Sequence, residues 1–341
     1  MHNRNYTIDC IRFFAAAAVV FFHVNQPISH IDNWYRNTVK YGWIGVPIFF
    51  IVSGYCIMAS AFHSANSLQF LLKRIFRIFP AYWLSLFIVL LAAIFEKLYT
   101  GYNSVPNLPL TFSAWLAMLT LTTSPLSHIK TANWVYWTLT YELCFYAVIS
   151  LLVLFRRSVA MVLLIAITAV SVFPGNAKYV FFLDNWMTFC LGGCIFLYFR
   201  YQGKHKWPYL ALLTALNIYS FISHQLLYQP IYISAVFLTI AVLVGSHYYR
   251  SHANLFSRLG EYSYSIYLIH VPIGIFILGD FKNSFIQQHI AANILYDLFT
   301  LTVVCVLSWQ MFRWVEMPGQ KIAHQISCKL FRRSPEARNV V

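Results

Sequence analysis

Arg12 and His23 are the residues whose types and spacing most directly suggest chemistry. Both lie in the apolar run "IRFFAAAAVVFFHV", Ile11–Val24, which contains no other titratable side chain. On an α-helix, eleven residues return the chain to within about 20° of its starting direction and advance it by about 16 Å. The two side chains therefore share one helix face, and their separation resembles the reach of an extended pantetheine arm. We expect the cation to hold a phosphate and the imidazole to act as a base beside a thioester.

A structural explanation of the same residues stays open. Arg12 could extend to the inner lipid headgroups, and His23 could hydrogen-bond within a helical bundle. The small residues Ala15–Ala18 could leave room for an acyl-carrying arm or allow close helix packing.

A second chemical signal is the stretch "KRIFRIFPAYW", residues 73–83. It groups the cations Lys73, Arg74 and Arg77 with the polar aromatic residues Tyr82 and Trp83. Arginine side chains match the geometry of phosphate oxygens, so this grouping predicts a site for an anionic cofactor that enters from the cytoplasm. Ordinary positive charge on the cytoplasmic side of a span would explain the cations but not the grouping.

Glu142 lies in a further apolar stretch, Asn133–Tyr146, at a predicted depth similar to that of His23. Charged residues are costly inside a membrane, so those present are functional candidates by default. A carboxylate at this depth could orient His23 and support its protonated form during general-base activation of a hydroxyl. The competing interpretation is a buried ion pair without a catalytic role.

The composition indicates that a membrane surrounds these side chains. Of the 341 residues, 60% are hydrophobic and only 10% are charged, which excludes an ordinary soluble domain. The formal net charge of +14 is then first an orientation signal, and no nucleic-acid partner is expected. The seven cysteines lie mostly in apolar runs without CxxC spacing, so neither disulfides nor a metal site is expected.

The expected fold is an all-α, polytopic transmembrane helical bundle. Apolar runs of spanning length predict about ten spans, at Ile8–Pro27, Gly42–Phe62, Phe79–Leu98, Trp134–Phe155, Val159–Phe173, Val180–Phe199, Pro208–His224, Ile231–Tyr249, Tyr262–Gly279 and Ala291–Trp314. The shorter run Thr111–Ser124 is expected to be re-entrant or interfacial. If it does not cross, most of the 24 lysine and arginine residues fall on one side, so both termini are predicted to be cytoplasmic. Residues 319–341 would form a basic cytoplasmic tail attracted to anionic lipid.

Six motifs, in this order, resemble those of the acyltransferase-3 family of bacterial membrane acyltransferases. They are the Arg12–His23 spacing and the stretches Gly42–Tyr55, Arg74–Trp83, Trp137–Tyr146, Leu259–Pro272 and Val315–Pro318. The resemblance extends from about Tyr6 to Lys321 and implies a membrane acyltransferase domain over residues 1–318. It implies acetyl-CoA from the cytoplasm as the acyl donor and a sugar hydroxyl on or near the outer side as the acceptor.

Roles for individual residues follow from the resemblance. It implies His23 as the catalytic base, and Glu142 occupies the family's acidic position. The donor-binding set is Arg12, Lys73, Arg74, Arg77, Tyr82 and Trp83. The expected substrate-binding residues are Trp137, Tyr141 and His270, with a structural alternative for His270, a buried histidine whose hydrogen bonds are satisfied within the bundle. Many members have an acidic residue after Gly–Val in the second span, whereas this chain has Pro47, so an acid role is absent there.

These features predict an O-acetyltransferase of the bacterial inner membrane. Its acceptor would be a surface polysaccharide, the O-antigen of lipopolysaccharide or an exopolysaccharide, still linked to its lipid carrier. His23 would deprotonate the acceptor hydroxyl or briefly accept the acetyl group. The alternative is a polysaccharide or small-molecule transporter in which Arg12, His23 and Glu142 form a proton relay, although the internal repeats of many transporters are missing. Membrane lipids are further expected partners, and the acceptor sugar and the oligomeric state stay open.

Overall fold

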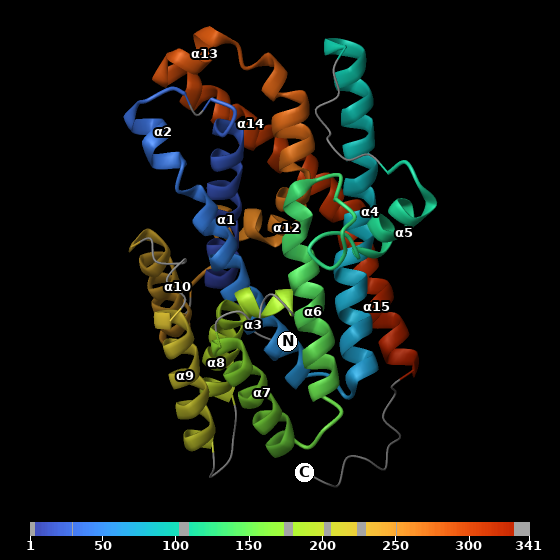
Figure 1. Cartoon of the computed structure of the whole chain (residues 1–341), viewed down its shortest axis with the longest axis vertical. Coiled ribbons are helices and arrows are strands. Elements are labelled where there is room, and N and C mark those ends of the chain that lie inside the picture. The colour runs from blue at the N-terminus through green and yellow to red at the C-terminus, as the bar shows by residue number, and fades with distance from the viewer. Residues whose placement is uncertain are drawn as a thin grey trace.

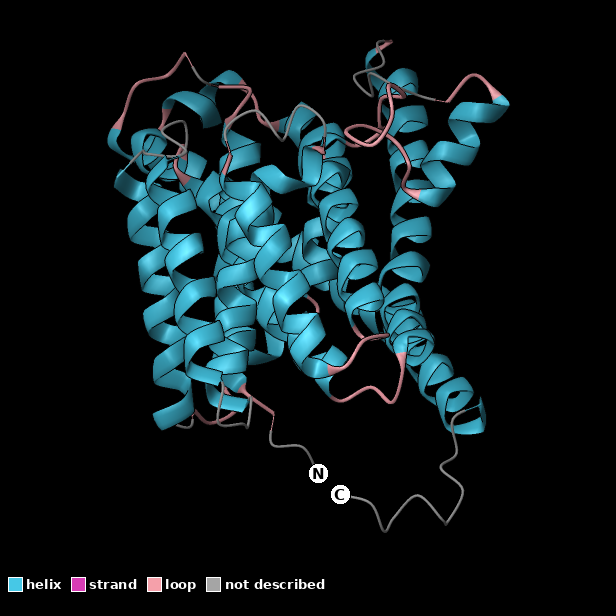
Figure 2. Cartoon of the chain, turned by 60° about the horizontal axis from the view of Figure 1, so that its bottom comes forward, coloured by secondary structure: helices cyan, strands magenta, loops and turns pink. Residues whose placement is uncertain are grey.

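Helices make up the regular structure of the computed structural model, which describes residues 4–28, 30–101, 109–173, 180–200, 206–223, 230–249 and 251–330. Within these ranges there is no strand, and the long helices run side by side (Figure 1, Figure 2). An α-helix satisfies its backbone polar groups internally, as a bilayer requires of any segment that crosses it. The predicted all-α, polytopic fold is confirmed.

Each of the ten predicted spans contains a helix in the described part of the chain. Eight helical segments there are long and apolar enough to cross a membrane. The other two predicted spans coincide with α7 and α9, of which α7 is apolar but shorter. The long helices are α1 (Tyr6–Asn25), α3 (Gly45–Phe62), α4 (Ser67–Thr100), α6 (Trp137–Leu152), α7 (Arg157–Val172), α8 (Trp186–Arg200), α9 (Lys206–Ser223), α10 (Pro230–Tyr248), α12 (Ser263–Val271), α14 (Ile290–Met311) and α15 (Met317–Leu330).

Shorter elements extend or connect the long helices. The short α-helices are α2 (Trp34–Val39), α5 (Phe112–Thr120), α11 (Leu255–Glu261) and α13 (Ser284–Gln288). The 3₁₀ segments are η1 (Gly42–Ile44), η2 (Trp134–Tyr136), η4 (Phe181–Asn185) and η7 (Gly279–Phe281), and the π-helical segments are η6 (Pro272–Ile277) and η8 (Phe312–Glu316). Helix α5 forms within the run Thr111–Ser124. Its nine residues rise only about 14 Å, too little to cross about 30 Å of hydrocarbon.

Helix α4 begins earlier than the sequence predicts. The expected span was Phe79–Leu98, but α4 is one continuous helix of 34 residues that starts after its capping residue, Asn66. The cation-rich stretch therefore lies inside a helix. Arg74 and Arg77, three positions apart, point about 60° apart around its axis, so they need not face the same surroundings.

The C-terminal helical path also runs further than the predicted last span, Ala291–Trp314. Helix α14, segment η8 and helix α15 follow one another without a break, and α15 packs against α4. The first part of the predicted tail is thus a packed helix that ends at Leu330. Its cytoplasmic location stays a prediction, and residues 331–341 lie outside the described ranges.

A proline and a glycine set the contact between α4 and α15. Pro80 lies inside α4 and cannot donate a hydrogen bond to the carbonyl of Phe76. A β-carbon on Gly319 of α15 would lie 3.0 Å from that carbonyl oxygen and 3.1 Å from the Pro80 ring. Glycine therefore lets α15 approach α4 at the turn that the proline distorts.

Glycine also lets α3 approach two other helices. A β-carbon on Gly45 would lie 2.4 Å from the carbonyl oxygen of Ala15 in α1, and one on Gly54 would lie 1.9 Å from that of Phe189 in α8. Contact through small residues is a main source of helix association in membranes. Because Ala15–Ala17 are buried, the structure favours close packing over an open passage as the explanation of the alanine run.

Candidate active site

Arg12 of α1 and Arg77 of α4 line two adjoining cavities. The first, which we call the core cavity, is narrow, with a volume of about 50 Å³, and its polar lining residues are Arg12, Ser53, Arg77, Thr138, Glu142, Tyr146, Tyr264 and Tyr267. The second, the terminal cavity, has a volume of about 310 Å³ at the start of α1, and its charged and amide lining residues are Arg4, Asn5, Asp9, Arg12, Arg77, Glu261 and Gln320. The two arginines are common to both, so they stand where the cavities meet.

The two guanidinium groups are free to bind a ligand. Among the described residues, neither Arg12 nor Arg77 has a hydrogen-bond or ion-pair partner. Glu316, 1% exposed, supplies a countercharge that attracts both through space. Its carboxylate accepts hydrogen bonds from Ser265 at 3.0 Å and from Gln320 at 3.2 Å. Two unpaired guanidinium groups that face a cavity form a site suited to an anion.

His23 lies in the last turn of α1, beside His270 of α12. The centroids of the two imidazole rings are 5.2 Å apart. Nδ1 of His23 is 3.2 Å from Oε1 of Gln26, an amide oxygen that only accepts, so Nδ1 carries the proton of the neutral ring. Trp134 flanks the ring, with centroids 6.0 Å apart. The half-buried His23 thus keeps Nε2 available as a base.

His270 is completely buried and held by the backbone. Its Nδ1 donates to the carbonyl oxygen of Tyr267 at 2.7 Å, while Nε2 is buried without a hydrogen-bond partner in the described part of the chain. Pro272 cannot donate to the carbonyl of Leu268, which instead accepts a hydrogen bond from Asn133 at 3.4 Å. After α12 the chain continues as the π-helical segment η6, and π-helical distortions are frequent at functional sites.

Tyr267 connects the cations to the imidazoles. It lines the core cavity with Arg12, and its ring centroid is 5.6 Å from that of His270. Its hydroxyl accepts a hydrogen bond from Thr138 at 2.9 Å, which fixes the ring. The rest of the cavity wall is apolar and consists of Val46, Phe49, Phe50, Ile78 and Leu139. Because Arg12 and His23 lie on one continuous helix, about 16 Å separates the two ends of this arrangement.

Glu142 does not lie beside His23, contrary to the expectation that it supports the imidazole. Its carboxylate lines the core cavity with Arg12 and Arg77 and accepts a hydrogen bond from Tyr146 at 2.6 Å. Among described residues, the His23 ring instead lies against Phe22, Gln26, Trp134 and His270. Depth along a span fixes only the height of a side chain, whereas the packing of α6 against α3 and α4 decides its lateral neighbours.

Arg74 is packed into the protein and lines neither of these cavities. Its Nη2 donates to the carbonyl of Cys56 at 2.8 Å, and its guanidinium lies over the rings of Phe70 and Tyr146 at 5.8 and 5.5 Å. Only 8% of the residue is exposed. The structure therefore joins Arg77 with the arginine of α1 at the cavities, rather than with Arg74 as expected.

Three further members of the predicted donor site also lie away from both cavities. The Lys73 ammonium is 3.5 Å from a serine hydroxyl before α4. Tyr82 donates to the carbonyl of Met118, and Trp83 donates to that of Leu119 at 2.9 Å. These carbonyls are at the C-terminal end of α5, where that of Met118 also accepts a hydrogen bond from the Leu121 N–H at 3.3 Å. The two aromatic residues thus fasten α5 to α4.

Trp137 and Tyr141, predicted to contact the substrate, form a second layer behind the core cavity. Their ring centroids lie 6.1 and 6.3 Å from that of Phe50, which lines the cavity itself. Tyr267 and Ser53, which line the core cavity, were not among the predicted site residues. A usable signal existed for Tyr267, since it stands three positions before His270 and so shares its helix face.

The chain matches an acyltransferase family over most of its length. A family model described as an acyltransferase domain matches residues 5–313. "Nodulation protein 10" of Rhizobium leguminosarum bv. viciae is 28% identical over 328 residues, covering 80% of this chain and 83% of that protein. "Putative acetyltransferase ORF330" of Acidianus two-tailed virus is 24% identical over 284 residues, covering 76% and 81%. "Putative membrane-bound transacylase BcsY" of Komagataeibacter xylinus is 36% identical over 81 residues, covering 23% and 18%. No solved structure matches the chain.

Proposed function

The chain belongs to the acyltransferase family whose domain it matches, and we propose that it is an O-acetyltransferase that moves an acetyl group from acetyl-CoA to a polysaccharide hydroxyl. Family membership and the apolar helices make it a multi-pass membrane acyltransferase. The proposed acceptor is an O-antigen or exopolysaccharide unit linked to a membrane lipid. The proposed location is the bacterial inner membrane, with transfer at its outer side and both termini in the cytoplasm.

One observation supports this proposal above the others. An anion site and a pair of imidazoles lie about three helical turns apart along α1, and Tyr267, which lines the core cavity with the anion site, lies beside His270. Acetyl-CoA has matching parts, because a flexible arm separates its phosphates from its thioester. Arg12 and Arg77, without partners among described residues, would bind phosphate oxygens. The apolar wall between them and Tyr267 would accept the arm.

The imidazole end has the groups that acyl transfer to a hydroxyl requires. His23 would take the proton of the acceptor hydroxyl as its oxygen attacks the thioester carbonyl. The new carbon–oxygen bond forms, the carbon–sulfur bond breaks, and His23 returns the proton to the departing thiolate. His270, with its ring against that of His23, would contact the acceptor or the acetyl group. Glu142 would act at the cation end, where it faces Arg12 and Arg77.

The test is the replacement His23→Ala, with insertion of the protein into the membrane confirmed. We expect the O-acetyl signals to disappear from the NMR spectrum of the surface polysaccharide while polymer still reaches the surface. His128→Ala, which changes an exposed histidine in the connection between α5 and η2, is the matched control and should leave the signals intact. Unchanged acetylation in His23→Ala would refute the proposal, and loss of surface polymer would favour an exporter.

A further inference from the structure

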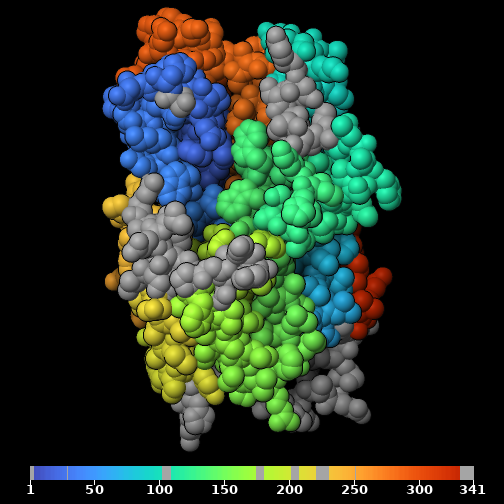
Figure 3. Space-filling view, viewed as in Figure 1, coloured from blue at the N-terminus to red at the C-terminus, as the bar shows by residue number. Residues whose placement is uncertain are grey.

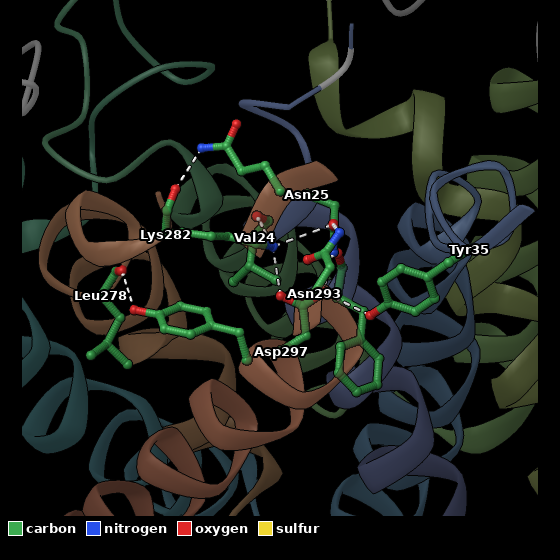
Figure 4. Close-up of polar contacts among 10 residues, drawn as sticks. Val24, Asn25, Tyr35, Leu278, Lys282, Asn293 and Asp297 are labelled. Carbon is green, nitrogen blue, oxygen red and sulfur yellow. Dashed lines mark hydrogen bonds and ion pairs between the residues drawn. The ribbon is translucent and has the colours of Figure 1, made fainter. Parts of the chain in front are cut away.

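A buried polar network holds the end of α1 that carries His23. Asp297 of α14 accepts hydrogen bonds from Lys282 at 2.7 Å, from Asn25 at 2.6 Å and from Tyr35 at 2.7 Å (Figure 4). Asn25 and Asp297 are 0% exposed and Lys282 is 5% exposed. The network joins α1, α2, α14 and the residue after η7 at one end of the molecule, where α2 and the segment around α13 lie against each other (Figure 1, Figure 3).

The contacts on α1 fall on the residues around His23. Lys282 Nζ donates to the carbonyl of Val24 at 3.3 Å and to Oδ1 of Asn25 at 3.4 Å. Asn25 Nδ2 also donates to the carbonyl of Phe21 at 3.0 Å. The last carbonyls of a helix have no intrahelical donor, and a cation is favoured at this end by the helix dipole. The network therefore fixes the backbone on both sides of His23.

Stability alone does not explain charged groups at this place. The cost of removing an ion pair from water offsets much of its attraction, and apolar residues of similar volume often hold helices together as well or better. A satisfied buried network, by contrast, enforces one arrangement because its hydrogen bonds are directional. Around Asp297, three donors on one carboxylate define how α2, α14 and the end of α1 meet.

Building on the acyl-transfer function proposed above, we infer that Asp297, Lys282 and Asn25 are positioning residues that orient the His23 ring toward His270. They line neither the core cavity nor the terminal cavity, so they act through α1. Their loss lets the last turn of α1 shift, which changes the direction of the base while the anion site at the other end of the helix stays intact.

The replacement Asp297→Asn tests this inference, since it keeps the shape of the side chain and removes its charge. We expect kcat for acetyl transfer to fall on the order of 100-fold, the effect of misplacing a catalytic group by about 1 Å, with the Kd of acetyl-CoA unchanged. Ser308→Ala is the matched control, because Ser308 is a buried residue of the same helix whose hydroxyl has no partner among described residues. Lys282→Arg keeps the ion pair and should retain activity.

A second readout does not depend on catalysis. The rate at which diethyl pyrocarbonate modifies His23, measured by peptide mass spectrometry relative to exposed His128, reports the environment of the ring. We expect Asp297→Asn to change this ratio and Ser308→Ala to leave it unchanged. Unchanged kcat in folded Asp297→Asn overturns the inference. If the wild-type protein shows no acyl transfer, the proposed function is refuted. The inference about Asp297 is then tested by the modification ratio alone, and an unchanged ratio in Asp297→Asn refutes it.

A milder variant covers the case in which Asp297→Asn does not fold. Tyr35→Phe removes one of the three hydrogen bonds to Asp297 and leaves the ion pair with Lys282 in place. We expect a smaller fall in kcat, again without a change in the Kd of acetyl-CoA. Wild-type kcat together with a wild-type modification ratio in Tyr35→Phe would then refute the inference.

Discussion

Replacement of Arg77 by alanine should weaken the binding of acetyl-CoA without unfolding the protein. The guanidinium lines both cavities and has no hydrogen-bond partner among described residues, so its removal breaks no internal hydrogen bond. A hydrogen bond to a charged group contributes about 1.5–3 kcal/mol, and about 1.4 kcal/mol corresponds to a factor of ten in affinity. Loss of one such bond to phosphate predicts a roughly 10- to 100-fold rise in Kd.

The assay compares acetyl-CoA with S-acetylpantetheine, a thioester without phosphates. Arg77→Ala should raise the Kd of acetyl-CoA only, and the wild-type protein should bind acetyl-CoA more weakly as salt increases. Arg74→Gln is the matched control, because Arg74 is occupied by a carbonyl and two aromatic rings. It should lower thermal stability and leave the Kd unchanged. Equal weakening of both ligands by Arg77→Ala, or a comparable rise in Kd for folded Arg74→Gln, would refute the assignment of the anion site.

Three further predictions concern packing and charge. Gly54→Ala should destabilise the protein by about 1–3 kcal/mol in thermal denaturation, because the new β-carbon would meet the Phe189 carbonyl. Gly245→Ala, where nothing lies within 4 Å, should be near neutral, and similar melting temperatures for the two variants would contradict this. Tyr82→Phe should cost about 1 kcal/mol by removing one buried hydrogen bond to the Met118 carbonyl, which keeps the Leu121 N–H as a donor; altered acetyl-CoA binding at full stability would instead place Tyr82 in the donor site. Glu142→Gln should lower the Kd of acetyl-CoA several-fold in a direct binding assay, because it removes a negative charge from the cavity that holds the cations; weaker binding would argue for a different role.

Local periodicity was sufficient to relate Arg12 to His23. Both lie on one uninterrupted helix, so their shared face and separation follow from residue spacing alone. The grouping of cations in residues 73–83 was also visible in the sequence, but the surroundings of each cation were not. Arg74 and Arg77 have similar sequence contexts, yet only Arg77 faces the cavities, because the packing of α3 and α6 covers the other side of α4.

Contacts between distant segments were beyond the reach of this reasoning. Glu142 could be assigned a height in its span, but its neighbours depend on how four helices meet in three dimensions. The partnership of Asp297 with Asn25 and Tyr35 joins positions that are 272 and 262 residues apart. In the sequence, Lys282 was simply a charge outside the spans, and its pairing with Asp297 became visible only in the folded chain.

The length of α4 has a practical consequence for imaging. Its 34 residues extend about 51 Å, while the hydrocarbon layer is about 30 Å thick. Part of this rigid helix must therefore stand clear of the lipid tails. A 341-residue protein that is mostly enclosed by a detergent micelle offers few features by which electron-microscope particles can be aligned. An antibody fragment that binds the protruding turns of α4 would provide such a landmark, held by a helix that continues to Arg77 in the proposed donor site.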